Sequence, residues 1–260
     1  MRSILVFADR SGAMSPRLET ALALARADKG HVTVLVDTPI SRYIAMDPMG
    51  GSYVASDALK EALEADDAFA AEIVTHLQRE DVPFDVQHSE DDPSEALAAS
   101  ARLADISVVS HGSLFAGQLA MIARGPVMVV RKDKPLAVPV GTVCIAWDGG
   151  DEAALALRSS ISLLAGAGAV HVLTVGEKPG GFEAADAMSY LSRHGVKAEL
   201  HVLKRSGTTE ETLAAAVARL RADLLVMGAF GHSRMREFLF SGVTRYFLED
   251  DGAPTLLLSH

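Results

Sequence analysis

The sequence predicts an α/β fold of two tandem units, each a doubly wound, five-stranded parallel sheet with helices on both faces. Three observations support this. Apolar runs of strand length alternate with helical stretches, the strand runs are nearly continuous Val, Ile and Leu, and the pattern occurs twice along 260 residues. Strand–helix alternation implies right-handed crossovers and a parallel sheet, and strands that are apolar throughout indicate that both faces are covered.

The internal repeat is clearest in the strands. The first run of each unit ends in an aspartate, Asp9 and Asp148. The strands expected in the first unit are residues 4–9, 31–36, 83–87, 104–109 and 125–130, and their counterparts are 143–148, 170–175, 198–203, 222–227 and 253–258. We therefore divide the chain into a unit at 1–132 and a unit at 141–260.

Helices are expected between these strands. Leu157, Ile161 and Leu164 follow the i, i+4, i+7 spacing of one helical face, and so do Leu213, Val217 and Leu220. Asp151 is the expected N-cap of the helix that follows Asp148.

Two segments lie outside the repeat. Residues 132–139, Lys-Asp-Lys-Pro-Leu-Ala-Val-Pro, are polar and contain two prolines, which is typical of a linker. Residues 39–56 have no counterpart in the second unit and contain Tyr43, Met46, Met49, Gly50, Gly51 and Tyr53. This insertion is either a lid or interaction loop, or an ordinary surface excursion packed on its unit.

Composition restricts the class of function. A net charge of −10 argues against a broad surface for nucleic acid or anionic membranes, although backbone N–H groups can still hold the phosphates of one nucleotide. Cys144, the single cysteine, lies in an apolar run, so we expect a buried inert thiol, with neither an intrachain disulfide nor a cysteine metal cluster. The first residues resemble a strand rather than a signal peptide, and no apolar stretch approaches membrane-spanning length. We expect a cytoplasmic protein without a membrane span.

The two units differ after their fourth strands. An ungapped alignment places Ser110 opposite Gly228 and Ser113 opposite Gly231. Pro254 follows Gly231 by 23 positions, whereas Pro126 follows Ser113 by only 13, so the first unit lacks about one long loop. Ligands of open α/β sheets bind at the carboxyl ends of the strands where the strand order reverses. The sequence therefore predicts one competent site, in the second unit, and one degenerate site.

The loop of the second unit has the chemistry of a phosphate cradle. It contains Gly228-Ala229-Phe230-Gly231, nine residues, and then Ser241-Gly242-Val243-Thr244. Glycine permits close approach of backbone to a ligand, and the free N–H groups at a helix start attract anions. Taken alone, these glycines could also serve only turns and caps.

With this motif the sequence resembles the universal stress protein family, whose pattern after the fourth strand is G-x2-G-x9-G-[ST]. The resemblance covers both units, with a well-formed motif only in the second. It implies five-stranded parallel sheets in the order 3-2-1-4-5, and ATP bound with adenine near the ends of strands 1 and 2 and phosphates in the glycine loop. Asp148 would face the adenosine and Val175 the adenine. The full set of nucleotide-binding candidates is Ala146, Trp147, Asp148, Val175, Met227, Gly228, Phe230, Gly231, His232, Ser233, Arg234, Ser241, Gly242, Val243 and Thr244.

The motif departs from the family pattern at one point. Ser241 stands at its third glycine position, and Gly242 stands where Ser or Thr is usual. Ser241 could weaken triphosphate binding or favour a shorter ligand, and Thr244 supplies a hydroxyl about one turn along.

Several candidate residues have a second interpretation. Asp148 could be a helix-cap carboxylate, His232 and Arg234 could face solvent rather than phosphate, and Trp147 is expected to pack near the site more readily than to stack on adenine. The cluster His88, Glu90, Asp91 and Asp92 is interpreted as a solvated turn and helix start rather than a metal site. No metal site is predicted.

The predicted function is a stress-response regulator that binds ATP, or ADP or AMP, with Mg²⁺ as the accompanying ion. The sequence has neither a Walker-type Gly-Lys-Ser/Thr nor a convincing Ser–His–Asp arrangement, so we expect ATP hydrolysis to be absent or slow. Two alternatives stay open: an ATP-using enzyme of the related adenine-nucleotide α-hydrolase-like fold, and a nucleotide-free interaction protein. By resemblance the two fifth strands pair within the chain as a pseudo-dimer. Homodimerisation and the identity of a protein partner are left open.

Overall fold

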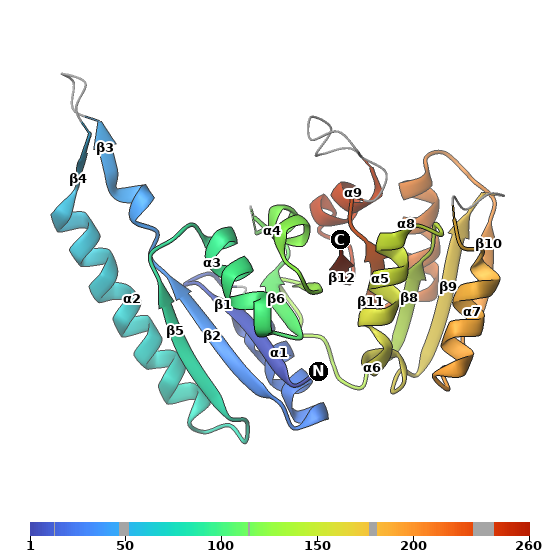
Figure 1. Ribbon diagram of the computed structural model, residues 1–260, viewed down its shortest axis with the longest axis horizontal. Helices are drawn as coiled ribbons and strands as arrows, with labels where there is room; N and C mark the ends of the chain where they lie inside the picture. The colour runs from blue at the N-terminus through green and yellow to red at the C-terminus, as the bar shows by residue number, and fades with distance from the viewer. Residues whose placement is uncertain (13, 47–51, 114, 177–180, 231–241) are drawn as a thin grey trace.

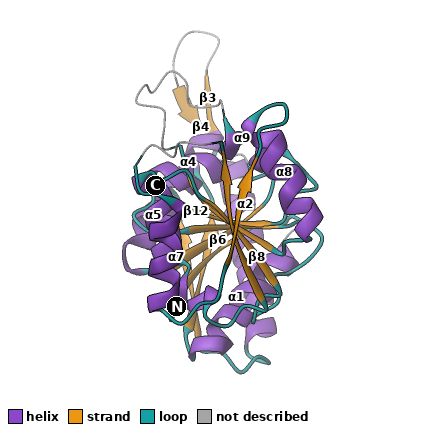
Figure 2. Cartoon of the chain, turned by 90° about the vertical axis from the view of Figure 1, so that its right-hand side faces the viewer, coloured by secondary structure: helices purple, strands orange, loops and turns teal. Residues whose placement is uncertain are grey.

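A computed structural model describes residues 1–12, 14–46, 52–113, 115–176, 181–230 and 242–260 (Figure 1). The strands of this part form one ten-stranded sheet and a separate two-stranded hairpin. Helices cover both faces of the large sheet (Figure 2). The chain is thus a three-layer α/β protein, as the alternation of strands and helices predicts.

Apart from the insertion at 39–56 and short 3₁₀ or broken helices, the two units share the same alternation of five strands with helices. The first contains β1 (Ser3–Ala8), α1 (Met14–Asp28), β2 (His31–Asp37), α2 (Ser56–Leu77), β5 (Phe84–Ser89), α3 (Pro93–Ser100), the 3₁₀ helix η2 (Ala101–Leu103), β6 (Ile106–Ser110), α4 (Ala116–Ile122) and β7 (Val127–Val130). The second contains β8 (Thr142–Ala146), α5 (Asp151–Ser159), α6 (Ile161–Leu164), β9 (Ala169–Val175), α7 (Ala184–Arg193), β10 (Glu199–Leu203), α8 (Thr209–Leu220), β11 (Leu224–Gly228), α9 (Val243–Glu249) and β12 (Thr255–Ser259).

The strand order within each unit is the expected 3-2-1-4-5, but the sheets are not separate. The full order is β10-β9-β8-β11-β12-β7-β6-β1-β2-β5. The fifth strands β7 and β12 pair antiparallel, with Val127 opposite Leu258 and Val129 opposite Leu256, whereas the other neighbours are parallel. Each unit is thus a parallel five-stranded sheet as predicted, and the predicted intrachain pseudo-dimer is confirmed. What the fold prediction did not state is that this pairing joins the two units into one mixed sheet.

A pair of aspartates anchors the fourth strand of each unit to the first. The carboxylate of Asp105, just before β6, accepts the backbone N–H of Ser3 at 3.1 Å. Asp223, just before β11, accepts the N–H of Thr142 at 3.0 Å. These N–H groups belong to the first residues of β1 and β8. The aspartate of each Ala-Asp pair thus supplies a carboxylate acceptor for a backbone N–H at the start of the first strand of its unit.

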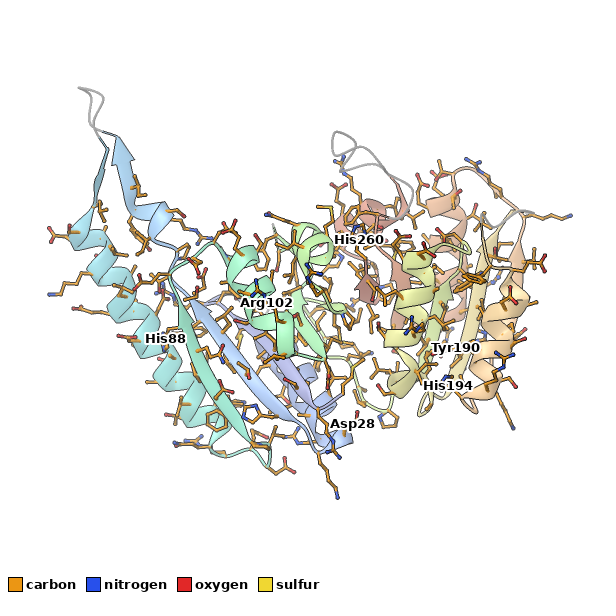
Figure 3. All side chains as sticks on the ribbon, viewed as in Figure 1. Asp28, His88, Arg102, Tyr190, His194 and His260 are labelled. Carbon is orange, nitrogen blue, oxygen red and sulfur yellow. The ribbon has the colours of Figure 1, made fainter. Side chains whose placement is uncertain are left out.

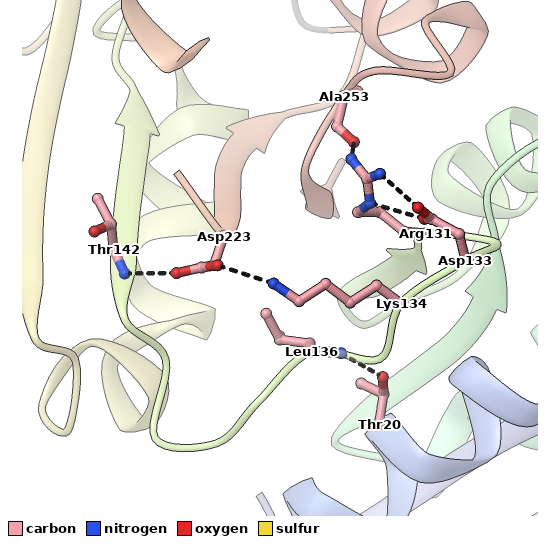
Figure 4. Close-up of polar contacts among 8 residues, drawn as sticks. All are labelled: Thr20, Arg131, Asp133, Lys134, Leu136, Thr142, Asp223 and Ala253. Atoms are coloured by element: carbon pink, nitrogen blue, oxygen red, sulfur yellow. Dashed lines mark hydrogen bonds and ion pairs between the residues drawn. The ribbon is translucent and has the colours of Figure 1, made fainter. Parts of the chain in front are cut away.

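The connection between the units is held firmly at residues 131–141 (Figure 4). Leu136 is buried, and its N–H donates to Thr20 Oγ1 of α1 at 2.9 Å. Lys134 forms an ion pair with Asp223 of the second unit at 3.7 Å. The segment predicted as a polar linker is therefore a strap that contacts both units.

Helix starts in the second unit follow local capping rules, with one correction. The N-cap of α5 is Gly150, and Asp151 is the first helical residue, so the predicted Asp151 cap is wrong by one position. The expected helix over 157–164 is interrupted at Ser160, whose buried hydroxyl donates to Leu157 O at 2.9 Å. Such back-bonding competes with the regular helix ladder.

The core fills both faces of the sheet. Alternate strand residues point to opposite faces, so Val170 and Val172 belong to one buried cluster and Leu173 to the other. Cys144 is fully buried, and its burial raises the pKa of the thiol to about 12, in agreement with the expected inert cysteine.

The insertion at 39–56 is packed on its unit at its start, where Pro39 is buried and the 3₁₀ helix η1 (Ile40–Tyr43) contacts α2, and continues into a hairpin. The hairpin consists of β3 (Ile44–Met46) and β4 (Ser52–Val54) and extends beyond the end of α2 (Figure 1). Ile44 and Val54 pair across the hairpin, and both side chains are exposed. In the described residues, no helix is both long and apolar enough to cross a membrane.

Candidate functional site

The second unit has its switch point at the carboxyl end of β8. β8 lies between β9 and β11, so the loops after β8 and β11 leave the sheet side by side at the place where the strand order reverses. Such crevices are the usual ligand sites of open α/β sheets. The fold therefore brings Ala146, Val175 and Met227, three of the predicted site residues, to one edge of the sheet, since each lies at or next to the end of its strand.

Asp148 lies at the centre of this edge. Its side chain is exposed, and Oδ1 accepts the N–H of Gly150 at 2.9 Å, where α5 begins. Gly149 between them has φ of +79°, a conformation that favours glycine. The turn fixes the carboxylate at the mouth of the switch point, so Asp148 orders the helix start and still presents its charge to solvent.

Trp147 is part of the core. It is 4% exposed, and its indole Nε1 donates to Phe182 O at 3.2 Å. Its own N–H donates to Leu173 O at 2.8 Å, extending the pairing of β8 with β9. Of the two interpretations of Trp147, the structure favours packing beside the site over direct stacking on a base.

Gly228 has a packing role that the motif alone does not reveal. A Cβ at this position would lie 2.7 Å from Ala153 N and 2.8 Å from Glu152 Cβ, closer than real Cβ atoms come. The missing side chain therefore lets the first turn of α5 approach the end of β11. Ala229, next along, donates its N–H to Ser259 O at 2.8 Å, and its carbonyl accepts from His260 Nδ1 at 2.8 Å.

The start of α9 closes this edge of the site. Gly242 is its N-cap, with φ of +115°, and no atom of the described residues lies within 4 Å of where its Cβ would be. Thr244 is buried, and its Oγ1 accepts the N–H of Phe230 at 3.4 Å. Phe230 has φ of +59°, an uncommon conformation for an aromatic residue. The Thr244 hydroxyl thus already supports the loop, whereas the exposed Gly242 offers open backbone.

The remaining glycine-loop candidates are Gly231, His232, Ser233, Arg234 and Ser241, and they lie outside the described residues. Val243, the first residue of α9, is half-buried against the core. The acidic cluster at 88–92 forms the turn and helix start that its sequence predicts, with the Asp92 carboxylate capping α3 by accepting Ser94 N–H at 3.0 Å.

The equivalent edge of the first unit is closed by an arginine. Arg17 of α1 is fully buried, and its guanidinium lies 2.8 Å from Asp9, the counterpart of Asp148. Burial alone would raise the pKa of the Asp9 carboxyl, but hydrogen bonds and charge attraction from Arg17, with help from Ser11, lower it overall. The guanidinium carbon also lies 5.6 Å from the centre of the Phe7 ring.

This arginine was missed at the sequence level, although the repeat contains its signal. Aligning Asp9 with Asp148 places Ala156 opposite Arg17. Ala156 is fully buried in α5, so the second unit has a methyl group where the first has a cation. The two switch points therefore differ in charge as well as in loop length.

A second acidic group at the first unit's edge was also missed. The two carboxylate oxygens of Asp37, at the end of β2, are buried and have no hydrogen-bond partner among the described residues. Burial raises the Asp37 pKa to about 7, Arg42 opposes the rise, and the nearby carboxylates of Asp92, Asp66 and Asp91 add to it. Position 37 aligns with Gly176, so this carboxylate too has no counterpart in the second unit.

Comparisons with known proteins agree with this architecture. Residues 139–257 match the model of the Universal stress protein family. No curated protein matches the chain.

Solved structures match along the whole chain. A universal stress protein from Archaeoglobus fulgidus DSM 4304 aligns with a TM-score of 0.74 and 15% identity, covering 99% of this chain and 96% of that one. A functionally unknown protein from Pseudomonas aeruginosa PAO1 aligns with a TM-score of 0.67 and 16% identity, covering 100% and 92%. A putative universal stress protein from Pseudomonas aeruginosa UCBPP-PA14 gives 0.65 and 15%, covering 100% and 93%. At these identities the matches establish the tandem fold, and the family model identifies the second unit. The second unit therefore belongs to the universal stress protein family, and the chain as a whole has the tandem fold of these structures.

Proposed function

We propose that the second unit, residues 141–260, binds one adenine nucleotide at the carboxyl ends of β8, β9 and β11, and that the first unit, residues 1–132, is a degenerate copy. The observation that carries this proposal is the contrast between the two switch points. Asp9 is closed by the buried Arg17, whereas Asp148 is exposed and has Ala156 opposite. A nucleotide could therefore use the Asp148 carboxylate of the second unit as a hydrogen-bond acceptor, whereas the Asp9 carboxylate of the first unit is already paired with Arg17.

The described residues fit the parts of an adenine nucleotide. Asp148 would accept hydroxyl groups of the ribose, Val175 would offer apolar contact to the base, and the exposed backbone at Gly242 would approach the phosphates. Mg²⁺ prefers oxygen ligands and usually keeps several waters, so it would be held mainly through the phosphates of the nucleotide. Phosphates are the natural ligands of a glycine-rich loop that leads into a helix.

We further propose that the protein is a nucleotide-linked stress-response regulator rather than an efficient ATPase. Phosphoryl transfer needs dense positive charge around the γ-phosphate and a positioned nucleophile. The sequence has no P-loop lysine, and the position that holds the buried cation in the first unit is Ala156 in the second. Bound ATP would therefore persist long enough to report nucleotide status to a protein partner.

The test is calorimetric titration of nucleotide-free, full-length protein with ATP, ADP and AMP in the presence of Mg²⁺. Asp148→Asn removes the proposed acceptor charge, and Asp151→Asn is the matched control because it removes an exposed charge three residues further on. We expect one nucleotide per chain. Hydrogen bonds to charged groups contribute about 1.5–3 kcal/mol, so Asp148→Asn should weaken binding roughly 10- to 100-fold. Asp151→Asn should change it little.

Other outcomes would contradict parts of the proposal. Two nucleotides per chain would show that Arg17 does not close the first unit. Equal losses in both variants would show that Asp148 acts only through general charge. Absence of binding would exclude nucleotide-linked regulation and favour a nucleotide-free interaction protein.

A further inference from the structure

Two histidines and a glutamate gather on the last two strands of the second unit. His171 lies on β9, and Glu199 and His201 lie on the edge strand β10. His171 Nδ1 is 3.1 Å from His201 Nε2, and each ring nitrogen is 3.7 Å from a carboxylate oxygen of Glu199. One potential ligand atom from each residue lies within 4.8 Å of the others.

Strand register explains why the three side chains meet. Glu199 pairs with His171, and His201 is two residues beyond Glu199, so all three lie on one face of adjacent parallel strands. The two histidine side chains are 14% and 20% exposed, whereas the glutamate is 68% exposed. The group is therefore partly sheltered and reachable from solvent on its glutamate side.

The spacing matches that of a tetrahedral metal centre. Zn²⁺ binds imidazole nitrogen and carboxylate oxygen at about 2.0–2.2 Å, so neighbouring ligand atoms of a tetrahedron lie roughly 3.3–3.6 Å apart. The two ring nitrogens are 3.1 Å apart, and each lies 3.7 Å from a different Glu199 oxygen, Oε2 for His171 and Oε1 for His201. One ligand atom of each residue already lies within 4.8 Å of the others, so rotations of the side chains would bring them into this range. Three protein ligands of the types His, His and Glu leave a fourth position for water.

We propose that His171, Glu199 and His201 bind a divalent transition metal, with Zn²⁺ as the expected ion. Imidazole ligands select Zn²⁺ and its neighbours Cu²⁺ and Ni²⁺, whereas Mg²⁺ and Ca²⁺ prefer all-oxygen sites. A bound ion would replace the direct contact between the two imidazoles and would staple the edge strand β10 to β9.

This metal site is separate from the proposed nucleotide site. His171 is the third residue of β9, and Val175 is four residues further along the strand, a separation of about 13 Å at the usual rise per residue. The metal would therefore lie on one face of the sheet near the middle of β9 and β10, whereas the nucleotide would lie at the carboxyl ends of the strands. Neither proposal depends on the other.

The test is titration of metal-free, full-length protein with Zn²⁺ in competition with a chromogenic chelator, in the absence of nucleotide. His201→Gln removes one ligand while keeping a polar side chain of similar reach. His194→Gln is the matched control, because His194 follows α7, which packs on the other face of the sheet. Its ring contacts that of Tyr190 in a tilted arrangement, with the ring centres 4.6 Å apart (Figure 3). Circular dichroism and thermal unfolding in the absence of metal verify that both variants fold.

We expect one Zn²⁺ per chain. Loss of an outer-shell partner already costs roughly 10- to 100-fold in metal affinity, so His201→Gln, which loses a direct ligand, should cost more than about 100-fold. His194→Gln should bind as the wild type does. Zn²⁺ should raise the melting temperature of the wild type but not that of His201→Gln, because a ligand that binds the folded state stabilises it.

Spectroscopy separates a metal centre from a hydrogen-bonded histidine pair. Co²⁺ in place of Zn²⁺ should give the visible absorption of a tetrahedral site, and His201→Gln should abolish it. Wild-type protein that takes up no Zn²⁺, or a His201→Gln variant that binds Zn²⁺ as tightly as wild type, would overturn the proposal. Either result would assign the cluster to strand pairing alone.

Discussion

The buried ion pair of the first unit leads to an asymmetric prediction. Arg17 is fully buried, whereas the Asp9 side chain is 36% exposed, and their closest polar atoms are 2.8 Å apart. Removing either partner breaks the same interaction but leaves a different charge behind. We therefore expect Asp9→Asn to destabilise the protein more than Arg17→Met does.

The magnitudes follow from where each charge is left. Asp9→Asn leaves a guanidinium that water cannot reach, and an uncompensated buried charge costs about 3–5 kcal/mol. Arg17→Met leaves a carboxylate that is partly hydrated and replaces the arginine stem by an apolar chain, so we expect about 1–3 kcal/mol. At about 2–4 °C per kcal/mol for a chain of this size, Asp9→Asn should lower the melting temperature by roughly 6–20 °C. The double variant removes both charges and should be more stable than Asp9→Asn alone.

Urea denaturation followed by circular dichroism measures these differences. Trp147, the single tryptophan, lies in the second unit, and its fluorescence should change in the same transition because β7 and β12 join the units in one sheet. The ion pair lowers the pKa of Asp9, so its stabilisation is present above the unfolded-state pKa and is lost as the pH falls through the folded-state value. The deficit of Arg17→Met should therefore shrink at acid pH. If Asp9→Asn proves milder than Arg17→Met, or the double variant is the least stable, the reasoning from burial is refuted.

Three further predictions concern single positions. Gly228→Ala places a Cβ 2.7 Å from Ala153 N and should destabilise the protein by about 1–3 kcal/mol in thermal unfolding, whereas Gly125→Ala, with 3.6 Å to its nearest neighbour, should be close to neutral. Burial raises the folded-state pKa of Asp37 to about 7, so the wild type loses stability as the pH rises from about 4 through 7; Asp37→Asn should remove this loss and be the more stable protein at pH 8 in melting curves. Thr208→Ala removes the side-chain acceptor of the α8 capping box and should cost about 1 kcal/mol in urea denaturation, and an unchanged midpoint would contradict this.

Much of the fold could be predicted because the same strand and turn residues recur in both units of the sequence. The strand runs, their order of appearance and the Ala-Asp pairs at 104–105 and 222–223 are all visible as patterns. Each unit also has a glycine just before its second strand, Gly30 and Gly168, where a side chain would not fit. A Cβ at Gly30 would lie 2.7 Å from Arg2 O, and one at Gly168 would lie 2.8 Å from Gly141 O. Each glycine lets the start of the second strand approach the chain just before the first.

The pairing of β7 with β12 was harder to predict, because an antiparallel pairing between two edge strands does not change their amino-acid composition. Val127 to Val130 and Thr255 to Ser259 are buried throughout, as any strand covered on both faces would be. Only the family resemblance predicted that they pair. Likewise, Asp151 is a good N-cap residue by type, but the Asp148–Gly150 turn moved the helix start to Gly150, a local geometry that residue preference does not encode.

The sequence could predict that the candidate residues meet at one edge of the sheet, whereas it could not predict how they pack. Nothing in the spacing of Gly228 distinguishes a glycine that admits phosphate from one that admits α5, because both require the absence of a Cβ. The burial of Trp147 likewise depends on the Phe182 carbonyl, 35 residues away. The His171–His201 pair escaped detection because its ligands come from two strands separated by a helix, with no short-range motif.

The two units differ in the residue that faces the aspartate after the first strand, which is Arg17 for Asp9 and Ala156 at the equivalent position for Asp148. In the first unit Asp9 has an internal partner, and the shorter loop after β6 removes the segment that would enclose a ligand. In the second unit Ala156 replaces the arginine and the long loop is retained. These two differences act in the same direction. The Arg17 guanidinium occupies the carboxylate that a ligand would use, and the shorter loop leaves fewer groups to hold that ligand. Under the proposed function, giving the first unit a nucleotide site should therefore require both changes, and Arg17→Ala alone should destabilise that unit without creating a site.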